Sequence, residues 1–343
     1  MSTFGERAMM GGSHRVLAAL CVLVSAALPL VGCATSEAGN GPSAGSGLMP
    51  VLSAVSLVAG ERLRVVATTS IVADVVRNIG GDAVKLTLLM PLGADPHAFE
   101  PTPQDAAVIS QAHVVFINGV GLEAFLDRLL TNAGGDVPVV SVSDGIALLA
   151  FVGDHADDEA EADEHRDGED DPHTWFDPNN VKVWVGNIES ALSALDPDHA
   201  TVYRENARAY LAELVALDAW IREAVAAIPQ DRRGLVTDHS VLTYFAHAYG
   251  FEQVGAVTAG SSTLSQPSAR EMAALQEAIV EHGVRAIFVS TTANPRMAEQ
   301  LARDTGIQVV PLYTGSLSDA SGPARTYLSF MRYDVGQIVE ALR

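Results

Sequence analysis

Three histidines of this chain lie in polar segments that follow or precede regular structure expected from the sequence. His97 lies in GADPHAFEPTPQD, His173 in DDPHTWFDP and His239 in TDHSVLTYF. Neutral imidazole is a good ligand for zinc and for other borderline divalent metals. One such histidine by itself is more often a hydrogen-bonded loop residue, but three at the rim of one cleft favour a metal site. The elements that carry them must therefore bring them together.

Short apolar segments rich in β-branched residues alternate with helical stretches, which is typical of βα units and a parallel sheet. Strands are expected at 63–68, 84–90, 113–118 and 137–142, and again at 234–237, 252–257, 285–290 and 308–312. Corresponding strands in the two halves are about 170 residues apart. The pattern predicts an α/β fold with two similar (βα)4-type lobes and parallel sheets, which bind ligands outside the carboxyl ends of their strands.

One long helix is expected between the lobes. Apolar residues recur at three- and four-residue steps over residues 198–228, and Pro229 ends the pattern. A helix of about 30 residues would be about 45 Å long, enough to run along both lobes. We therefore assign a first lobe to 62–195, a linking helix to 196–229 and a second lobe to 230–343, with the metal in the cleft between the lobes.

The amino-terminal residues have the composition of a secretion signal. Two arginines precede an apolar run, 16–30, that is too short to span a bilayer comfortably. The sequence LVGC that ends at Cys33 resembles the bacterial lipoprotein signal, in which the cysteine is lipidated. We expect residues 1–32 to be the signal peptide and 33–61, rich in Gly, Ser and Ala, to be a flexible lipid-anchored tether. The expected location is the extracytoplasmic face of the cell membrane.

The acidic residues are concentrated in one segment. The chain has 42 Asp and Glu against 21 Lys and Arg, a formal net charge of −21, which excludes a nucleic-acid binder that relies on overall positive charge. Residues 154–171 contain eleven of these acids and one arginine. Such a run is often only a solvated loop, but beside His173 it could raise the local cation concentration and speed metal capture. The side chains assigned to this role are His155, Asp157, Asp158, Glu159, Glu164 and His165.

Several motifs resemble those of a known family. The segments GADPHAFEPTP, DPHTWFDP and DHSVLTYFAHAYGF, together with the lipoprotein signal, resemble the metal-specific solute-binding lipoproteins of ABC importers for zinc and manganese, the cluster A-I or periplasmic zinc-binding protein family. The resemblance covers residues 62–343. It implies two (βα) lobes joined by one long helix, with the metal between them.

The same resemblance implies a set of ligands. It places metal ligands at His97, His173 and His239, and the histidine at the third position, where several manganese binders carry Glu, points to zinc. Many members have a fourth ligand, the Asp of a YTDSL loop, but this chain has YTGSL with Gly315 at that position. We expect water in the fourth coordination position, with Asp319 as the alternative ligand.

The function implied is capture of Zn²⁺ as cargo and its delivery to an ABC permease, whose cytoplasmic ATPase drives transport. We expect a lipid-anchored monomer that binds no nucleic acid. Because protonated imidazole cannot ligate, binding should weaken as the pH falls through the imidazole range.

The alternatives are a manganese-specific protein of the same family, a surface adhesin functioning in cell adhesion, and a zinc hydrolase with three histidines and a water on the metal. The sequence contains no H-E-x-x-H or P-loop motif, which argues against an enzyme.

Overall fold

The computed structural model describes residues 50–134, 137–151, 170–258 and 266–343. These residues belong to one compact unit, Ser46–Arg343. In this part of the chain, no helix combines the length and the hydrophobicity that crossing a bilayer requires. The predicted signal peptide, the lipidation site and six side chains assigned to metal gathering lie outside the described residues: Cys33, His155, Asp157, Asp158, Glu159, Glu164 and His165.

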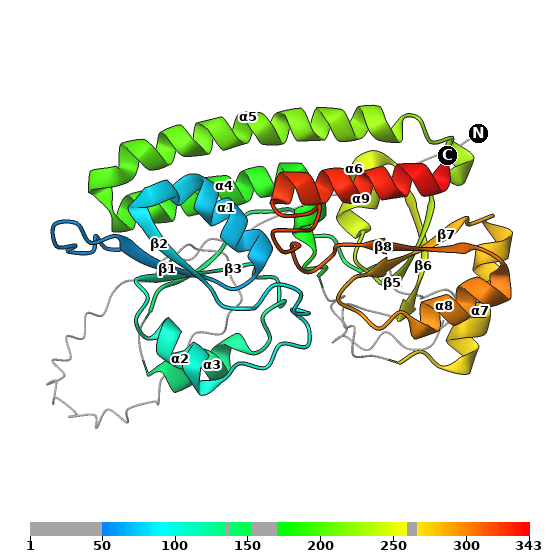
Figure 1. The fold of residues 1–343 in the computed structure, drawn as a ribbon, viewed down its shortest axis with the longest axis horizontal. Helices are drawn as coiled ribbons and strands as arrows, with labels where there is room; N and C mark the ends of the chain where they lie inside the picture. The colour runs from blue at the N-terminus through cyan, green and yellow to red at the C-terminus, as the bar shows by residue number, and fades with distance from the viewer. Residues whose placement is uncertain (1–49, 135–136, 152–169, 259–265) are drawn as a thin grey trace, which may run out of the picture. The chain divides into compact units, whose positions relative to one another are not determined.

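The first lobe is built on a parallel sheet with the strand order β2-β1-β3-β4. Its strands are β1 (Leu63–Ala67), β2 (Val84–Leu88), β3 (Val114–Ile117) and β4 (Val139–Ser141). Its helices are α1 (Ser70–Gly80), α2 (Pro103–Ile109) and α3 (Leu126–Ala133). Figure 1 shows α1 on one side of the sheet and α2 and α3 on the other.

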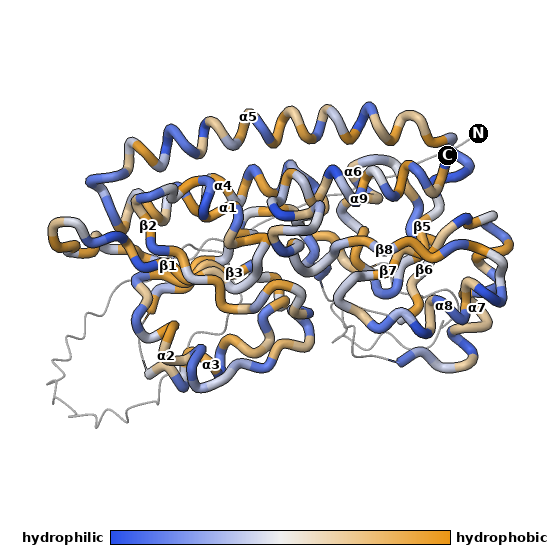
Figure 2. Tube along the Cα trace, in the orientation of Figure 1, coloured by the Kyte–Doolittle hydropathy of each residue, from blue (hydrophilic) through white to orange (hydrophobic). Residues whose placement is uncertain are grey.

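Successive side chains of a strand point to opposite faces of the sheet, which explains why helices cover both faces. Val65 and Phe116 pack into the large core that contains α1, whereas Val66 and Val115 pack with the residues of α2 and α3. Both faces of the sheet are thus covered by helices, as is usual for a parallel sheet. The apolar residues are accordingly concentrated in the strands (Figure 2).

The second lobe repeats this plan with the strand order β6-β5-β7-β8, again all parallel. Its strands are β5 (Gly234–His239), β6 (Glu252–Thr258), β7 (Ala286–Ser290) and β8 (Gln308–Leu312). Its helices are α6 (Thr243–Tyr249), α7 (Ala269–Glu281), α8 (Arg296–Thr305) and α9 (Tyr327–Leu342). The predicted repeat and fold class are confirmed, and the ends of the strands differ from the predicted ones by at most two residues.

The linking helix is α5 (Ala200–Val225), which has 26 residues instead of the expected 30 or so. It is preceded by α4 (Pro178–Leu195), and a 3-10 turn at Pro197–His199 reverses the chain between the two helices. Helix α5 packs against α4, against α1 of the first lobe and against α9 of the second, and so runs along both lobes (Figure 1). Of the apolar residues that recur along it, Leu211 is half-buried, and the others are buried: Tyr203, Ala207, Tyr210, Leu214, Leu217 and Ile221.

Part of the segment that the sequence assigns to the tether lies against the first lobe. The backbone N–H of Val55 donates to the carbonyl of Leu195, at 2.8 Å. Leu52, Val55 and Leu57 are half-buried and pack against the main core. The folded part thus begins before Leu63, because burying these three apolar side chains against the lobe is favourable.

Candidate metal centre

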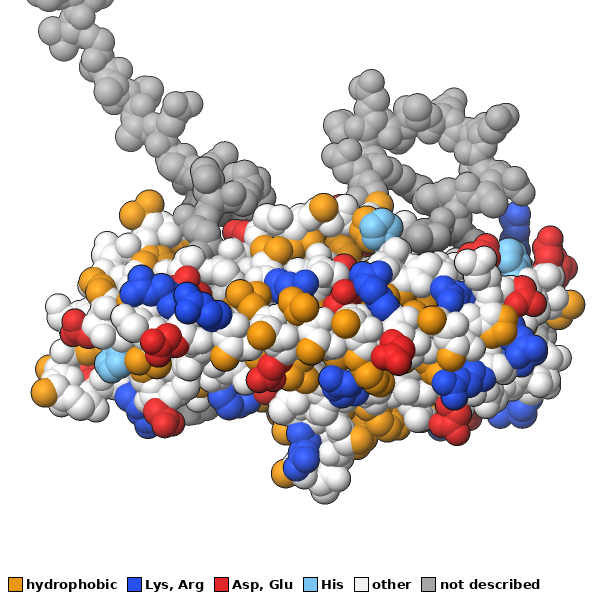
Figure 3. All heavy atoms as spheres, turned by 90° about the horizontal axis from the view of Figure 1, so that it is seen from above, with side chains coloured by type: hydrophobic (Ala, Val, Ile, Leu, Met, Phe, Trp, Pro, Cys, Tyr) orange, Lys and Arg blue, Asp and Glu red, His pale blue; other side chains and the backbone are white. Residues whose placement is uncertain are grey.

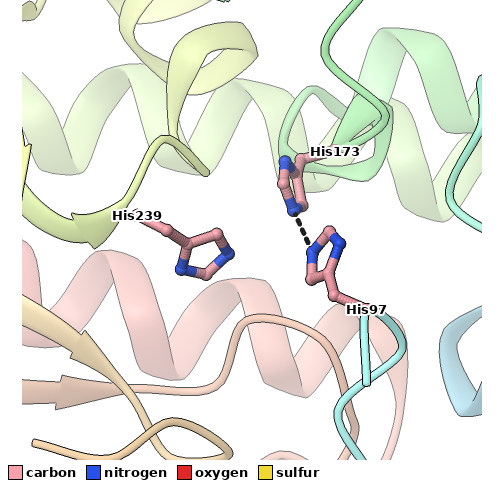
Figure 4. Close-up of side chains that lie close together, drawn as sticks. All are labelled: His97, His173 and His239. Atoms are coloured by element: carbon pink, nitrogen blue, oxygen red, sulfur yellow. Dashed lines mark hydrogen bonds between the residues drawn. The ribbon is translucent and has the colours of Figure 1, made fainter. Parts of the chain in front are cut away.

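The three predicted histidines come from three different loops or strand ends. His97 lies in the loop after β2, and His239 is the last residue of β5. His173 lies directly before the 3-10 turn Thr174–Phe176 that leads into α4. Figure 4 shows the three rings pointing toward one another. Since β2 and β5 belong to different lobes, the group bridges the lobes.

The distances within the group are short. Nε2 of His97 and Nε2 of His173 are 3.1 Å apart. The ring centroids are separated by 5.1 Å for His97 and His173, 5.5 Å for His97 and His239, and 5.3 Å for His173 and His239. One nitrogen from each ring lies within 4.8 Å of the others, and among the described residues no second group of three His, Cys, Asp or Glu side chains meets this criterion. Three nitrogen donors therefore converge on one point.

The surroundings favour the uncharged form of two imidazoles of this group, those of His97 and His173. His173 and His239 are buried, while His97 is partly exposed. Burial, assisted by the neighbouring His173 and His239, lowers the pKa of His97 to about 2. Burial also lowers the pKa of His173, although Asp171 acts in the opposite direction. The neutral form is the one that binds a metal, so these two side chains are ready to ligate at neutral pH.

Two buried aspartates orient two of the rings. Nδ1 of His173 donates to Oδ1 of Asp171 at 2.6 Å, and Nδ1 of His239 donates to Oδ1 of Asp238 at 3.0 Å. Each carboxylate also accepts from the backbone N–H of the same histidine. A carboxylate on one ring nitrogen leaves the other free for a metal and increases its basicity.

The sequence reasoning did not identify these two aspartates as partners of the histidines. Asp171 is the last acid of the acidic segment 154–171 and lies two residues before His173. Asp238 directly precedes His239. A carboxylate one or two residues before each candidate ligand is the signal that could have found them. Asp238 is held in turn by the backbone N–H of Ser290, which donates to Oδ2 at 3.0 Å.

The alternative fourth ligand, Asp319, does not join the histidine group. Its carboxylate is exposed, and Oδ1 accepts hydrogen bonds from Ser321 N, Ser321 Oγ and Gly322 N. These contacts close a local turn instead of reaching the cleft. Gly315 lies closer to the site, against Pro96, the residue before His97.

A wider comparison with known proteins agrees with this architecture. Two α/β lobes joined by a long helix, with three imidazoles between them, define a solute-binding protein for a divalent metal. The family model described as zinc-uptake complex component A, periplasmic (ZnuA), matches residues 65–341. The chain belongs to this family of periplasmic metal-binding proteins.

Individual relatives match over most of their length. The manganese-binding lipoprotein MntA of Halalkalibacterium halodurans is 35% identical over 284 residues, 82% of this chain and 89% of MntA. The manganese ABC transporter substrate-binding lipoprotein PsaA of Streptococcus pneumoniae is 30% identical over 315 residues, 87% of this chain and 98% of PsaA.

Solved structures match equally well. The periplasmic zinc binding protein TroA of Treponema pallidum has a TM-score of 0.73 at 30% identity, covering 82% of this chain and 99% of TroA. The manganese-bound periplasmic metal binding protein of Candidatus Liberibacter asiaticus has a TM-score of 0.72 at 29% identity, covering 82% of this chain and all of that one. The comparisons confirm the predicted family resemblance and the prediction of a transport component instead of an enzyme. The relatives' names include both manganese and zinc, so the choice of metal has to come from the site.

Proposed function

We propose that this chain is the zinc-binding component of an ABC importer, which captures Zn²⁺ with His97, His173 and His239 and hands it to a membrane permease driven by a cytoplasmic ATPase. The observation that carries the choice of metal is the composition of the group. It has three imidazole nitrogens, and within the described residues no carboxylate joins them. Imidazole suits zinc, whereas manganese favours oxygen ligands.

The geometry supports capture with little rearrangement. Ligand nitrogens of a tetrahedral zinc site, with bonds near 2.0 Å, lie about 3.3 Å apart. His97 and His173 already have their Nε2 atoms 3.1 Å apart. Asp171 holds the ring of His173 and Asp238 holds that of His239, so a small movement of one ring completes the arrangement. Water would take the fourth coordination position, because Gly315 has no side chain and the carboxylate of Asp319 accepts a hydrogen bond from the backbone of Gly322.

The test is a titration of metal-free protein with zinc and, separately, with manganese in competition with a chelator. We expect zinc to bind at least about a thousandfold more tightly than manganese, since manganese has a low affinity for a site with nitrogen ligands alone. The variants His97→Ala, His173→Ala and His239→Ala should each lose zinc binding by about a hundredfold or more. His247→Ala, a change at an exposed histidine of α6, is the control and should bind as the wild type does.

Manganese is the second candidate, because MntA and PsaA carry it in their names. Comparable affinities for the two metals, or elemental analysis that finds manganese in protein purified from its native host, would favour it over zinc.

The anchor and the assembly state belong to the same proposal. Cys33 would carry the lipid, and the chain would act as a monomer on the extracytoplasmic face of the membrane. Cys33→Ser should abolish the incorporation of labelled fatty acid into the protein, while sedimentation of the protein without residues 1–33 should give the mass of one chain. Fatty-acid label retained by Cys33→Ser would argue against lipidation of Cys33.

A further inference from the structure

The main chain just before His173 is held by both lobes. The carbonyl of Pro172 accepts a hydrogen bond from Nδ2 of Asn118, which follows β3 in the first lobe, at 2.9 Å. The carbonyl of Asp171 accepts one from the hydroxyl of Tyr244, at 3.0 Å. Tyr244 lies on α6, the helix that follows His239 in the second lobe. Two successive carbonyls are thus fixed from opposite sides of the cleft.

The hydroxyl of Tyr244 makes a second contact on the same segment. It accepts from the backbone N–H of Leu149, at 3.2 Å, and the carbonyl of Leu149 accepts from the backbone N–H of Asp171, at 2.8 Å. Ala150 and Asp170 form an antiparallel bridge next to this pair. The tyrosine is 3% exposed, so its hydroxyl satisfies two main-chain groups away from water. Leaving a buried main-chain group without a hydrogen-bond partner costs free energy, so these two hydrogen bonds favour one position of the main chain at Asp171.

A shift of Asp171 would move His173. Oδ1 of Asp171 binds both the backbone N–H and Nδ1 of His173, and its Oδ2 is buried without a hydrogen-bond partner. The ring orientation therefore follows the position of the Asp171 main chain, which Tyr244 holds from the other lobe.

We propose that Tyr244 is a positioning residue, which sets His173 relative to His239 through the main chain of Asp171. The proposal rests on the proposed function, because it treats the two histidines as ligands of one metal. It assigns to α6 a role in the metal centre, although none of its residues is a ligand. Outer contacts of this kind typically change metal affinity by 10–100-fold when removed.

The test compares Tyr244→Phe with Tyr203→Phe. Tyr203 is also buried, and its hydroxyl donates to Oδ2 of Asp196 at 2.8 Å, where α4 turns into α5. Each variant loses one buried tyrosine hydroxyl and keeps its ring, so both should lower the unfolding temperature of the metal-free protein to a similar extent. Only Tyr244→Phe should weaken zinc binding, by about tenfold or more, and speed zinc release to a chelator.

A double-mutant cycle with Asp171→Asn shows whether Tyr244 acts through that residue. The losses of zinc affinity in the two single variants should not add up in the double variant. Additive losses, or a Tyr244→Phe protein with wild-type affinity and release rate, would overturn the role of Tyr244. Failure of the wild-type protein itself to bind zinc would instead overturn the proposed function. All proteins are compared at a temperature well below their unfolding transitions.

Discussion

Gly315 of the second lobe approaches Pro96 of the first so closely that a β-carbon at position 315 would lie 2.7 Å from Cδ of Pro96. Carbon atoms do not pack at that distance without a shift of one of them, and the proline ring is not a flexible chain end. Because Pro96 is bonded to His97, the contact ties the loop after β8 to the position of one histidine of the metal centre.

This contact predicts the effect of introducing a side chain at position 315. Gly315→Ala should displace Pro96 and His97 and weaken zinc binding roughly tenfold. Gly315→Asp carries the same β-carbon, and we expect a similar loss. Both affinities are measured by chelator competition. Tighter zinc or manganese binding by Gly315→Asp, with weaker binding by Gly315→Ala, would show that the new carboxylate reaches the metal and that the steric expectation is wrong.

The response of zinc affinity to pH follows from the lowered pKa values. Two histidines with an ordinary pKa near 6.5 would cost about tenfold each in affinity between pH 7.5 and 5.5, because each would have to lose a proton to bind. The pKa of His97 is lowered to about 2 and that of His173 is also lowered, so these two should contribute almost nothing to the loss, in contrast to the weakening through the imidazole range that the sequence led us to expect. Isothermal titration in several buffers measures both the affinity and the protons released. A hundredfold loss accompanied by proton release at pH 5.5 would contradict the neutral state of these rings.

The stability of the metal-free protein should carry the pH dependence instead. A histidine whose pKa is lowered in the folded state takes up a proton only on unfolding, so stability falls as the pH drops below the unfolded value of 6.5. For one such group the loss between pH 7.5 and 5.5 is about 1.4 kcal/mol. The variant His97→Asn removes this group, so its urea midpoint should fall less with pH than that of the wild type. Equal slopes would contradict the assignment.

Asp334 on α9 predicts the opposite dependence, a loss of stability as the pH rises. It is buried, Oδ1 accepts from the backbone N–H of Tyr313 at 3.0 Å, and Oδ2 has no partner. Burial raises its pKa well above 3.8. An acid whose pKa is raised in the folded state contributes stability below its unfolded pKa and loses that contribution as the pH rises.

We therefore expect the stability of Asp334→Asn relative to the wild type to increase from pH 4 to pH 8, as measured by urea unfolding. The control is Asp319→Asn, which removes an exposed carboxylate whose pKa is lowered by hydrogen bonds from Ser321 and Gly322, and which should show no such increase. An advantage of Asp334→Asn that does not change with pH would contradict a raised pKa.

The acidic segment should affect the rate of metal capture more than its affinity. Replacing the acids of 154–169 with Asn and Gln removes the local negative charge and should lower the association rate of zinc at low salt, with little effect at high salt. The face seen in Figure 3 has basic, acidic and apolar side chains interspersed, so it does not supply a comparable charge. Stopped-flow mixing measures the rate. An unchanged rate at low salt would leave the segment as a solvated loop.

Much of the fold could be predicted because it depends on local patterns. The strand positions follow from apolar, β-branched runs, and the repeat follows from their regular spacing. The stripe of α5 could be read because a helix buries every third or fourth residue. The packing of Leu52, Val55 and Leu57 could not be predicted in this way, since it depends on the surface that the folded lobe offers them.

The sequence by itself determined the lobes, the linking helix and which three histidines lie at strand ends or in loops, because these features depend on periodicity and on chain order. Only the tertiary structure decided how the histidines meet and what holds them. The contacts of Gly315 with Pro96 and of Tyr244 with Asp171 join residues that are far apart in the chain, and they depend on how two folded lobes pack. The lowered pKa of His97 depends on the same packing, because burial and neighbouring rings cause it and both exist only after the lobes are together.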